Sequence, residues 1–257
     1  RPDGSDFMVD VIKKLDIEYC PSNAASSFRG LHDSLVNHLG NRAPEMLMCL
    51  HEEQAVAIAH GYAKASGRLM GVVLHSNVGL MHGTMAIFNA WCDRVPMLIL
   101  GATGPWDAAK RRPWIDWIHT SADQGALVRD YTKWDNQPAS VPAAYEALLR
   151  AVQIADTAPR GPTYVNLDAA LQELRDRVEH LLHLAVIASD LRELLGTSTT
   201  ATSAPSASAS WSARSRCSPA SRCSRRRCRC ATGCSRPSWC AMPTVRCASA
   251  ASPPPAT

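Results

Sequence analysis

Glu52 and His75 are the side chains of this sequence whose type and setting best suit proton transfer. Glu52 lies near the start of residues 50–63, a segment with one almost wholly apolar helix face. At a helical period of 3.6 residues, that face holds Ala55, Val56, Ala59, Tyr62 and Ala63. Glu53 falls on another face, so we expect Glu52 to point inward and Glu53 outward. A carboxylate is costly to bury, and a buried one is often catalytic or strongly paired. The alternative for Glu52 is a helix-capping role.

His75 opens a polar loop directly after an apolar run. Residues 69–74 are typical of a buried parallel strand, and the loop reads His75-Ser76-Asn77-Val78-Gly79. A small-residue helix then leads to Asp93, and a short apolar strand follows at residues 96–101. An imidazole with a reference pKa of about 6.5 can move protons near neutral pH. The alternative for His75 is a hydrogen-bonded histidine at a strand end, and Gly79 would serve a tight turn and a close helix approach.

This order of motifs resembles the pyrimidine-binding domain of thiamine diphosphate-dependent enzymes. In that family a glutamate stands nine residues before Gly-Tyr-Ala, as Glu52 stands before Gly61-Tyr62-Ala63. The helix after the loop ends near an Asp, and a Pro-apolar strand follows, as at Asp93 and Pro96. The similarity extends over about residues 6 to 168. It implies an α/β domain, the thiamine diphosphate-binding fold, with a parallel sheet and helices on both faces.

Within the family, the loop is more similar to benzoylformate decarboxylase than to acetolactate synthase-like members, which usually carry Thr-Ser-Gly-Pro-Gly there. The resemblance makes His75 an active-site acid/base that also contacts substrate. It makes Ser26 the nearest match to a substrate-contacting serine, although Asn23-Ala24-Ala25-Ser26 lacks the family's Pro-Gly. Gly101-Ala102 replaces the Gly-Gln of the synthases, which also argues against an acetolactate synthase.

The resemblance also implies a cofactor and a reaction. Glu52 would be catalytic and would bind the pyrimidine ring of thiamine diphosphate, with Ser76, Asn77 and Gly79 also contacting the cofactor. The substrate would be a 2-oxo acid that is decarboxylated or ligated, with the cofactor as electron sink. Mg²⁺ is expected for the family, but its Gly-Asp-Gly motif is absent from these 257 residues, and no metal ligand is assigned here.

The family builds its active site from two subunits, so the resemblance implies a homo-oligomer, a dimer or a tetramer. Without a diphosphate domain we expect a truncated enzyme with little or no turnover alone. The alternative is a non-catalytic α/β dimerisation module or a remnant subunit. We expect a cytoplasmic location, because we find neither a signal peptide nor an apolar run of membrane-spanning length.

The elements that must position these residues alternate between strand and helix, which favours a parallel α/β sheet in one domain, residues 1–175. Ser140 is a plausible N-cap for the last predicted long helix, with Pro142 in its first turn. Besides the segments above, we predict helices at residues 6–15, 28–39 and 141–157, and strands at 17–20, 45–50 and 162–167.

Residues 105–134 separate the last strand and helix pair from the rest, and they hold three closely spaced tryptophans. Trp106, Trp114 and Trp117 indicate either a partner surface or lid, or a satellite core. His51 and His60 are interpreted as ordinary polar positions.

The composition changes after a connecting helical segment predicted at residues 176–196. Residues 197–257 contain no Asp or Glu, nine Arg and seven of the ten Cys. The net charge of this tail is therefore +9, whereas residues 1–196 carry −5 and the whole chain +4. Three interpretations stay open: a metal site, a nucleic-acid-binding arm, and a non-native reading frame of a GC-rich gene. We favour the third and expect a disordered tail, because the Cys spacing is not that of a zinc site and no aromatic residues alternate with Arg. Neither a membrane nor a nucleic acid is expected as a partner.

Overall fold

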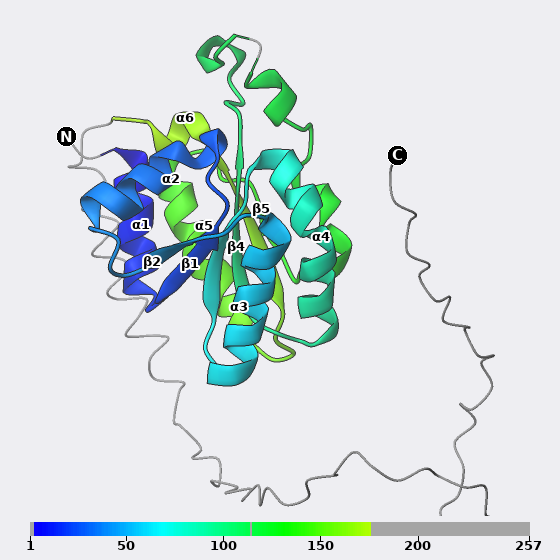
Figure 1. Ribbon diagram of the computed structural model, residues 1–257. Coiled ribbons are helices and arrows are strands. Elements are labelled where there is room, and N and C mark those ends of the chain that lie inside the picture. Colours follow the sequence, from blue (N-terminus) through cyan, green and yellow to red (C-terminus); the bar gives the residue numbers. More distant parts are fainter. Residues whose placement is uncertain (1–2, 114, 176–257) are drawn as a thin grey trace, which may run out of the picture. The chain divides into compact units, whose positions relative to one another are not determined.

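The computed structural model describes residues 3–113 and 115–175, and a six-stranded parallel sheet lies at its centre (Figure 1). The strand order is β2-β1-β3-β4-β6-β5. The strands are β1 (Tyr19–Ser22), β2 (Glu45–Met48), β3 (Met70–Val73), β4 (Met97–Thr103), β5 (Asp135–Asn136) and β6 (Pro162–Asp168). The α-helices are α1 (Gly4–Lys14), α2 (Arg29–Asp33), α3 (Glu52–Ser66), α4 (Ser76–Cys92), α5 (Val141–Asp156) and α6 (Ala169–Gln172). Trp114, the predicted connecting segment 176–196 and the predicted tail 197–257 lie outside the described residues.

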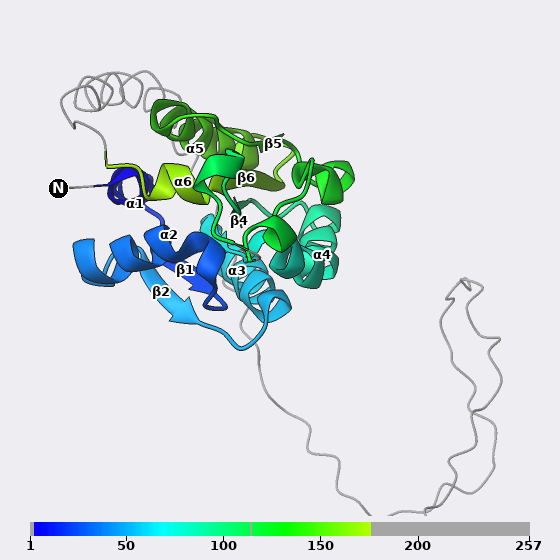
Figure 2. The same cartoon turned by 90° about the horizontal axis from the view of Figure 1, so that it is seen from above.

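Helices cover both faces of the sheet, as the sequence predicted. Side chains alternate along β4, so Leu98 and Leu100 pack with α1 and α5, whereas Met97 and Ile99 pack with α3 and α4. Figure 2, seen from above, places α1 and α5 on one side of the strands and α3 and α4 on the other. Both faces of the central strands are therefore apolar, which explains the uninterrupted apolar runs in the sequence.

Local signals set most element ends. Ser140 caps α5 by accepting from the Ala143 amide, and Pro142 lies in its first turn, as predicted. The helix predicted at residues 28–39 is instead divided into a 3-10 turn (Ser26–Phe28), α2 and a π-turn (Ser34–His38). The strand predicted at 17–20 lies two residues later, and β5 has only two residues and no sequence pattern of its own.

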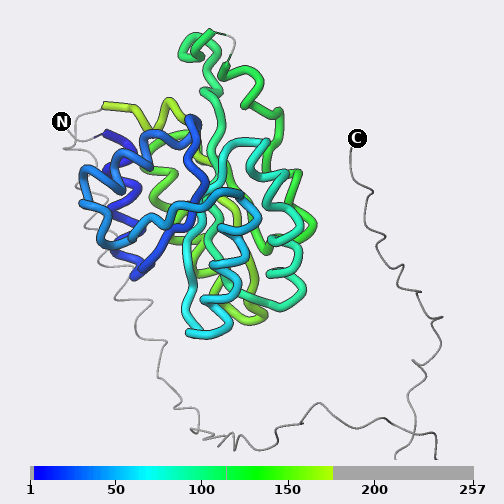
Figure 3. Tube along the Cα trace, in the orientation of Figure 1, coloured from blue at the N-terminus to red at the C-terminus, as the bar shows by residue number. Residues whose placement is uncertain are grey.

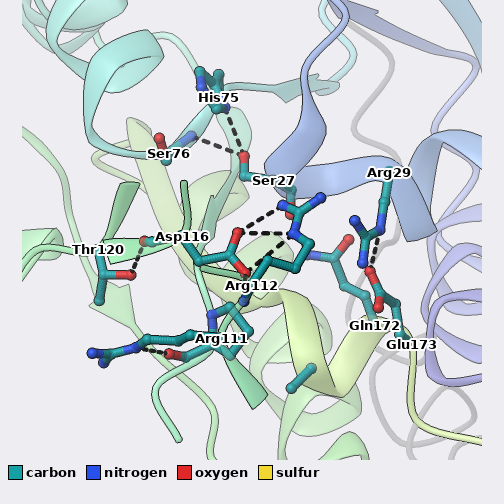
Figure 4. Close-up of polar contacts among 12 residues, drawn as sticks. Ser27, Arg29, His75, Ser76, Arg111, Arg112, Asp116, Thr120, Gln172 and Glu173 are labelled. Atoms are coloured by element: carbon teal, nitrogen blue, oxygen red, sulfur yellow. Dashed lines mark hydrogen bonds and ion pairs between the residues drawn. The ribbon is translucent and has the colours of Figure 1, made fainter. Parts of the chain in front are cut away.

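The last helix of the described chain closes the domain onto the turn that follows β1. Gln172, which is fully buried, donates a hydrogen bond from Nε2 to the Ser27 carbonyl and accepts one from the Leu31 amide. Arg29 and Glu173 form an ion pair beside it (Figure 4). The turn that carries Ser27 is thus fixed from the far end of the domain.

Residues 105–134 form a series of short 3-10 turns. The first part of this segment rises above the carboxyl edge of the sheet, and the turns Gly125–Leu127 and Arg129–Tyr131 return beside α4 (Figure 3). Trp106 and Trp117 are 53% and 63% exposed, which excludes the satellite-core interpretation for these two residues. Within residues 3–113 and 115–175, no helix is long and apolar enough to cross a membrane. The cytoplasmic location stays a prediction.

Candidate functional site at the carboxyl edge of the sheet

Three connections that leave the carboxyl ends of neighbouring strands carry the candidate site. The turn after β1 supplies Asn23 and Ser27, and the connection after β2 leads to Glu52. His75 lies in the short link between β3 and α4. Because all strands are parallel, these connections meet at one edge of the sheet, where open α/β sheets bind their ligands.

Glu52 is the first residue of α3, and its carboxylate is almost completely buried, with 5% of the residue exposed. Glu53 is exposed, so the predicted inward and outward directions are confirmed. Asn23 Nδ2 donates to Glu52 Oε1 at 3.3 Å, and His82 Nδ1 lies 3.4 Å from Oε2. Both contacts are long for hydrogen bonds, so this buried carboxylate is only weakly paired within the described residues.

Gly79 lies directly against this carboxylate. A Cβ atom at Gly79 would stand 3.0 Å from Glu52 Oε1, 3.1 Å from Glu52 Cγ and 2.8 Å from the Cβ of His75. Such contacts are too short for real side chains, so only glycine lets the first turn of α4 approach Glu52 this closely. The predicted close helix approach at Gly79 is confirmed. The predicted tight turn there is wrong, because Gly79 lies inside α4.

His75 is the N-cap residue of α4, and Ser27 holds its ring. Ser27 Oγ lies 2.8 Å from His75 Nδ1 and also accepts the backbone N–H of Ser76 (Figure 4). Burial lowers the pKa of His75, the neighbouring His119 lowers it further, and Glu52 opposes the shift. The arrangement therefore favours a neutral imidazole at neutral pH.

A second histidine reaches this place from residues 105–134. The rings of His119 and His75 lie 4.6 Å apart between centroids, tilted by 58°. Asn77 holds the turn that carries His119, because its Nδ2 donates to the Ile118 carbonyl at 3.3 Å. Two imidazoles thus face each other beside Glu52, which is an arrangement able to pass protons to and from a bound molecule.

The structure brings together most of the residues selected from sequence. Glu52, His75, Ser76 and Gly79 lie around the first turns of α3 and α4, and Asn77 joins them through its own contacts. Ser26 begins the 3-10 turn after β1, and the hydroxyl that contacts His75 is that of its neighbour Ser27.

Sequence reasoning missed Asn23, Ser27, His82 and His119. Asn23 and Ser27 stand in the loop already singled out. His82 follows Gly79 by three residues and so shares its helix face. This spacing could have indicated that His82 lies near Glu52. Nothing local distinguishes His119.

These residues suit the pyrimidine ring of thiamine diphosphate, the group that the resemblance implies. The ring needs a carboxyl group shielded from water, and Glu52 offers one whose present partners are weak. The absence of a side chain at Gly79 leaves the space beside Oε1 free of protein atoms from that position. The donor set therefore agrees with a pyrimidine-binding half-site.

Comparison with known proteins decides the family. Residues 2–128 match the family described as thiamine pyrophosphate enzyme, N-terminal TPP binding domain. Residues 2–128 belong to this family. The matched range contains every residue named above as part of the candidate site. Thiamine pyrophosphate is another name for thiamine diphosphate, so the resemblance drawn from the sequence is confirmed.

Relatives of this TPP binding domain include both enzymes with which the loop sequence was compared. The chain is 32% identical over 137 residues to benzoylformate decarboxylase of Pseudomonas aeruginosa, an alignment that covers 52% of this chain and 25% of the relative. It is 27% identical over 165 residues to the acetolactate synthase large subunit of Lactococcus lactis, covering 64% of this chain and 27% of the relative. The chain therefore spans about a quarter of the length of these curated relatives.

A solved structure shows the same fold. The crystal structure of benzoylformate decarboxylase from Polynucleobacter necessarius superposes with a TM-score of 0.60 at 20% identity, covering 69% of this chain and 32% of that one. The parallel α/β architecture of the TPP binding domain is thus shared at low sequence identity.

Proposed function

We propose that this chain supplies the pyrimidine half of a thiamine diphosphate site in a 2-oxo acid decarboxylase or carboligase. The observation that supports this most is the carboxylate of Glu52, which is 5% exposed, weakly paired and covered by Gly79. Relatives named as benzoylformate decarboxylase and acetolactate synthase favour a 2-oxo acid as substrate.

When bound, thiamine diphosphate supplies an electron sink for breaking or making a bond beside a carbonyl carbon. Glu52 would hold the pyrimidine ring by a hydrogen bond in a buried setting. Ser76, Asn77 and Gly79, in the first turn of α4, would line the cofactor. His75, kept neutral by burial and by His119, accepts or donates a proton at the substrate, and Ser26 contacts the substrate.

The diphosphate and its Mg²⁺ require ligands from elsewhere. The family's Gly-Asp-Gly motif does not occur in these 257 residues. We therefore expect no measurable carbon dioxide release when the purified chain alone is given a 2-oxo acid such as benzoylformate.

A second copy of the chain is the partner that α4 favours. Val78, Met81, Met85 and Phe88 are 39%, 52%, 56% and 41% exposed, and their spacing places them along one stripe of the helix. A stripe of large apolar side chains on a helix is typical of a subunit interface. This stripe is also what favours the second candidate function, a dimerisation module without catalysis.

The decisive experiment compares two adjacent glutamates. Isothermal titration calorimetry of the full chain with thiamine diphosphate should give binding that Glu52→Gln weakens at least about 10-fold, because a charge-assisted hydrogen bond is lost. Glu53→Gln, at an exposed position, should bind like the unchanged chain. Equal affinities for both variants would contradict the proposal.

Light scattering separates the second candidate function from the first. Met85→Glu should convert a dimer to a monomer, because it places a charge in the apolar stripe. A stable dimer that binds no thiamine diphosphate would support the dimerisation module alone. A monomeric unchanged chain at high concentration would exclude the pairing through α4.

A further inference from the structure

The group His51, Glu52 and His82 has the composition of a transition-metal site. One possible ligand atom from each residue lies within 4.8 Å of those of the other two. Among residues 3–113 and 115–175, this is the one group of three or more His, Cys, Asp or Glu side chains placed closely enough to hold a metal ion. His51 caps the start of α3, Glu52 is its first residue, and His82 projects from α4. The three side chains are thus presented by two helices packed on the same face of the sheet.

We propose that His51, Glu52 and His82 bind a divalent transition-metal ion of the Zn²⁺ class at the outer rim of the half-site. Zn²⁺ binds imidazole nitrogen and carboxylate oxygen at about 2.0 to 2.2 Å in tetrahedral geometry, so two ligand atoms on one ion stand about 3.4 Å apart. Glu52 Oε2 and His82 Nδ1 are 3.4 Å apart. The separation of this pair is thus the one expected for two ligand atoms of one ion.

The third ligand is close to its place. The rings of His51 and His82 stack with 5.0 Å between centroids and 9° between planes. The side chain of His82 is 54% exposed, so an ion can reach it from solvent. His51 Nδ1 accepts the Glu53 amide at 3.2 Å, so metal binding by this ring costs α3 at most one capping hydrogen bond.

Charge and ligand type select the ion. Glu52 is a buried carboxylate with two long contacts, so a cation would satisfy it better than its present partners do. Two imidazoles favour Zn²⁺, Ni²⁺ or Cu²⁺ over Mg²⁺, which prefers oxygen. The positive end of the α3 dipole and the presence of three rather than four protein ligands weaken binding, so we expect a micromolar dissociation constant.

The ion would use the carboxylate that the proposed function assigns to the pyrimidine ring. Metal binding itself does not depend on that function, but competition with thiamine does. If both hold, Zn²⁺ and thiamine exclude each other at Glu52, so the metal blocks cofactor binding.

The test is Zn²⁺ calorimetry on the full chain after its accessible thiols are alkylated with iodoacetamide. Residues 197–257 contain no His, Asp or Glu, so alkylation removes their metal ligands. His51→Asn keeps a capping side chain, and His82→Asn changes a solvent-facing one. Each should weaken Zn²⁺ binding at least about 10-fold. His38→Asn, which changes a histidine paired with Asp10 elsewhere, should have no effect.

Circular dichroism of each variant checks that the fold is intact. Equal Zn²⁺ affinity in the unchanged chain and in the His51→Asn/His82→Asn double variant would overturn the site. Thiamine, which has no diphosphate to chelate the ion, is then added. If Zn²⁺ binding depends on both histidines but thiamine does not weaken it, the metal site stands and the pyrimidine placement at Glu52 fails. If no Zn²⁺ binds while thiamine diphosphate binding still requires Glu52, the metal site alone fails.

Discussion

Ser27 Oγ lies 2.8 Å from His75 Nδ1 and joins the turn after β1 to the end of β3. Ser27 also accepts the Ser76 amide, so one hydroxyl orients the imidazole and the first turn of α4 together. The position of His75 relative to Glu52 is therefore set by a side chain from a third chain segment.

Ser27→Ala should loosen His75 and lower the free energy of unfolding by about 1 kcal/mol, since it removes a partly buried hydrogen bond. Urea unfolding measures the loss. Ser26→Ala, one residue earlier, is the control and should stay within about 0.5 kcal/mol of the unchanged chain. Nitrogen NMR of the His75 ring should show a changed tautomer population only in Ser27→Ala. A larger effect at Ser26 would show that the wrong serine has been assigned.

His75 should make the folded state sensitive to mild acid. Its pKa is lowered in the folded protein by burial and then by His119, so between that value and about 6.5 the unfolded chain binds more protons. Stability should therefore be full above about pH 6.5 and fall as the pH drops below it.

Urea unfolding at pH 7.5 and 5.5 tests this effect. His75→Asn should lose less stability between these two pH values than the unchanged chain, and His119→Asn should show a smaller reduction of the same kind. The same pH dependence in all three proteins would show that His75 does not cause it.

Gly79→Ala should destabilise the domain by about 1 to 3 kcal/mol, because its Cβ would press on Glu52 and on His75. Gly61→Ala is the matched control, since it lies in the exposed part of α3 with no atom within 4 Å of a new Cβ. That change should stabilise by up to about 1 kcal/mol through helix propensity. Thermal unfolding distinguishes the two, and a neutral Gly79→Ala would mean that α4 can withdraw from Glu52.

Asp116 should hold residues 105–134 in place. Its carboxylate is 4% exposed and accepts from the Arg112 amide at 2.7 Å and from Arg112 Nη2 at 2.6 Å. The hydrogen bonds from Arg112 lower the pKa of Asp116. The stabilisation of the folded chain by ionised Asp116 is therefore present above about pH 4, and it is lost as the pH falls through the lowered pKa.

Trypsin, which cleaves after Lys110 and Arg111, reports the effect of Asp116→Asn. Cleavage there should become several-fold faster, because a buried charge-assisted pair costs about 1 to 3 kcal/mol to break. Asp123→Asn changes a carboxylate that is 55% exposed and should leave the rate unchanged. Equal cleavage rates in both variants would place the support of this segment elsewhere.

Local rules predicted most of the fold and the buried face of α3. The period of 3.6 residues separated Glu52 from Glu53, and Ser140 with Pro142 marked the start of α5, because these signals depend on neighbours along the chain. The contact of Ser27 with the ring of His75 could not be predicted in this way. It depends on the phase of a 3-10 turn that packing against Gln172 decides.

Two other features were outside the reach of local reasoning. His119 meets His75 only through the path of residues 105–134, in which short 3-10 turns leave no periodic pattern. Strand β5 exists because β6 offers it an edge, not because Asp135 and Asn136 favour a strand.

The hydrogen bond from Gln172 to Ser27 also bears on when the site can form during synthesis. The two residues are 145 positions apart, and Ser27 in turn orients His75. Glu52, His75 and Gly79 all leave the ribosome long before Gln172 does. A nascent chain that stops before α6 would therefore contain every residue of the half-site and still lack the contact that fixes its geometry.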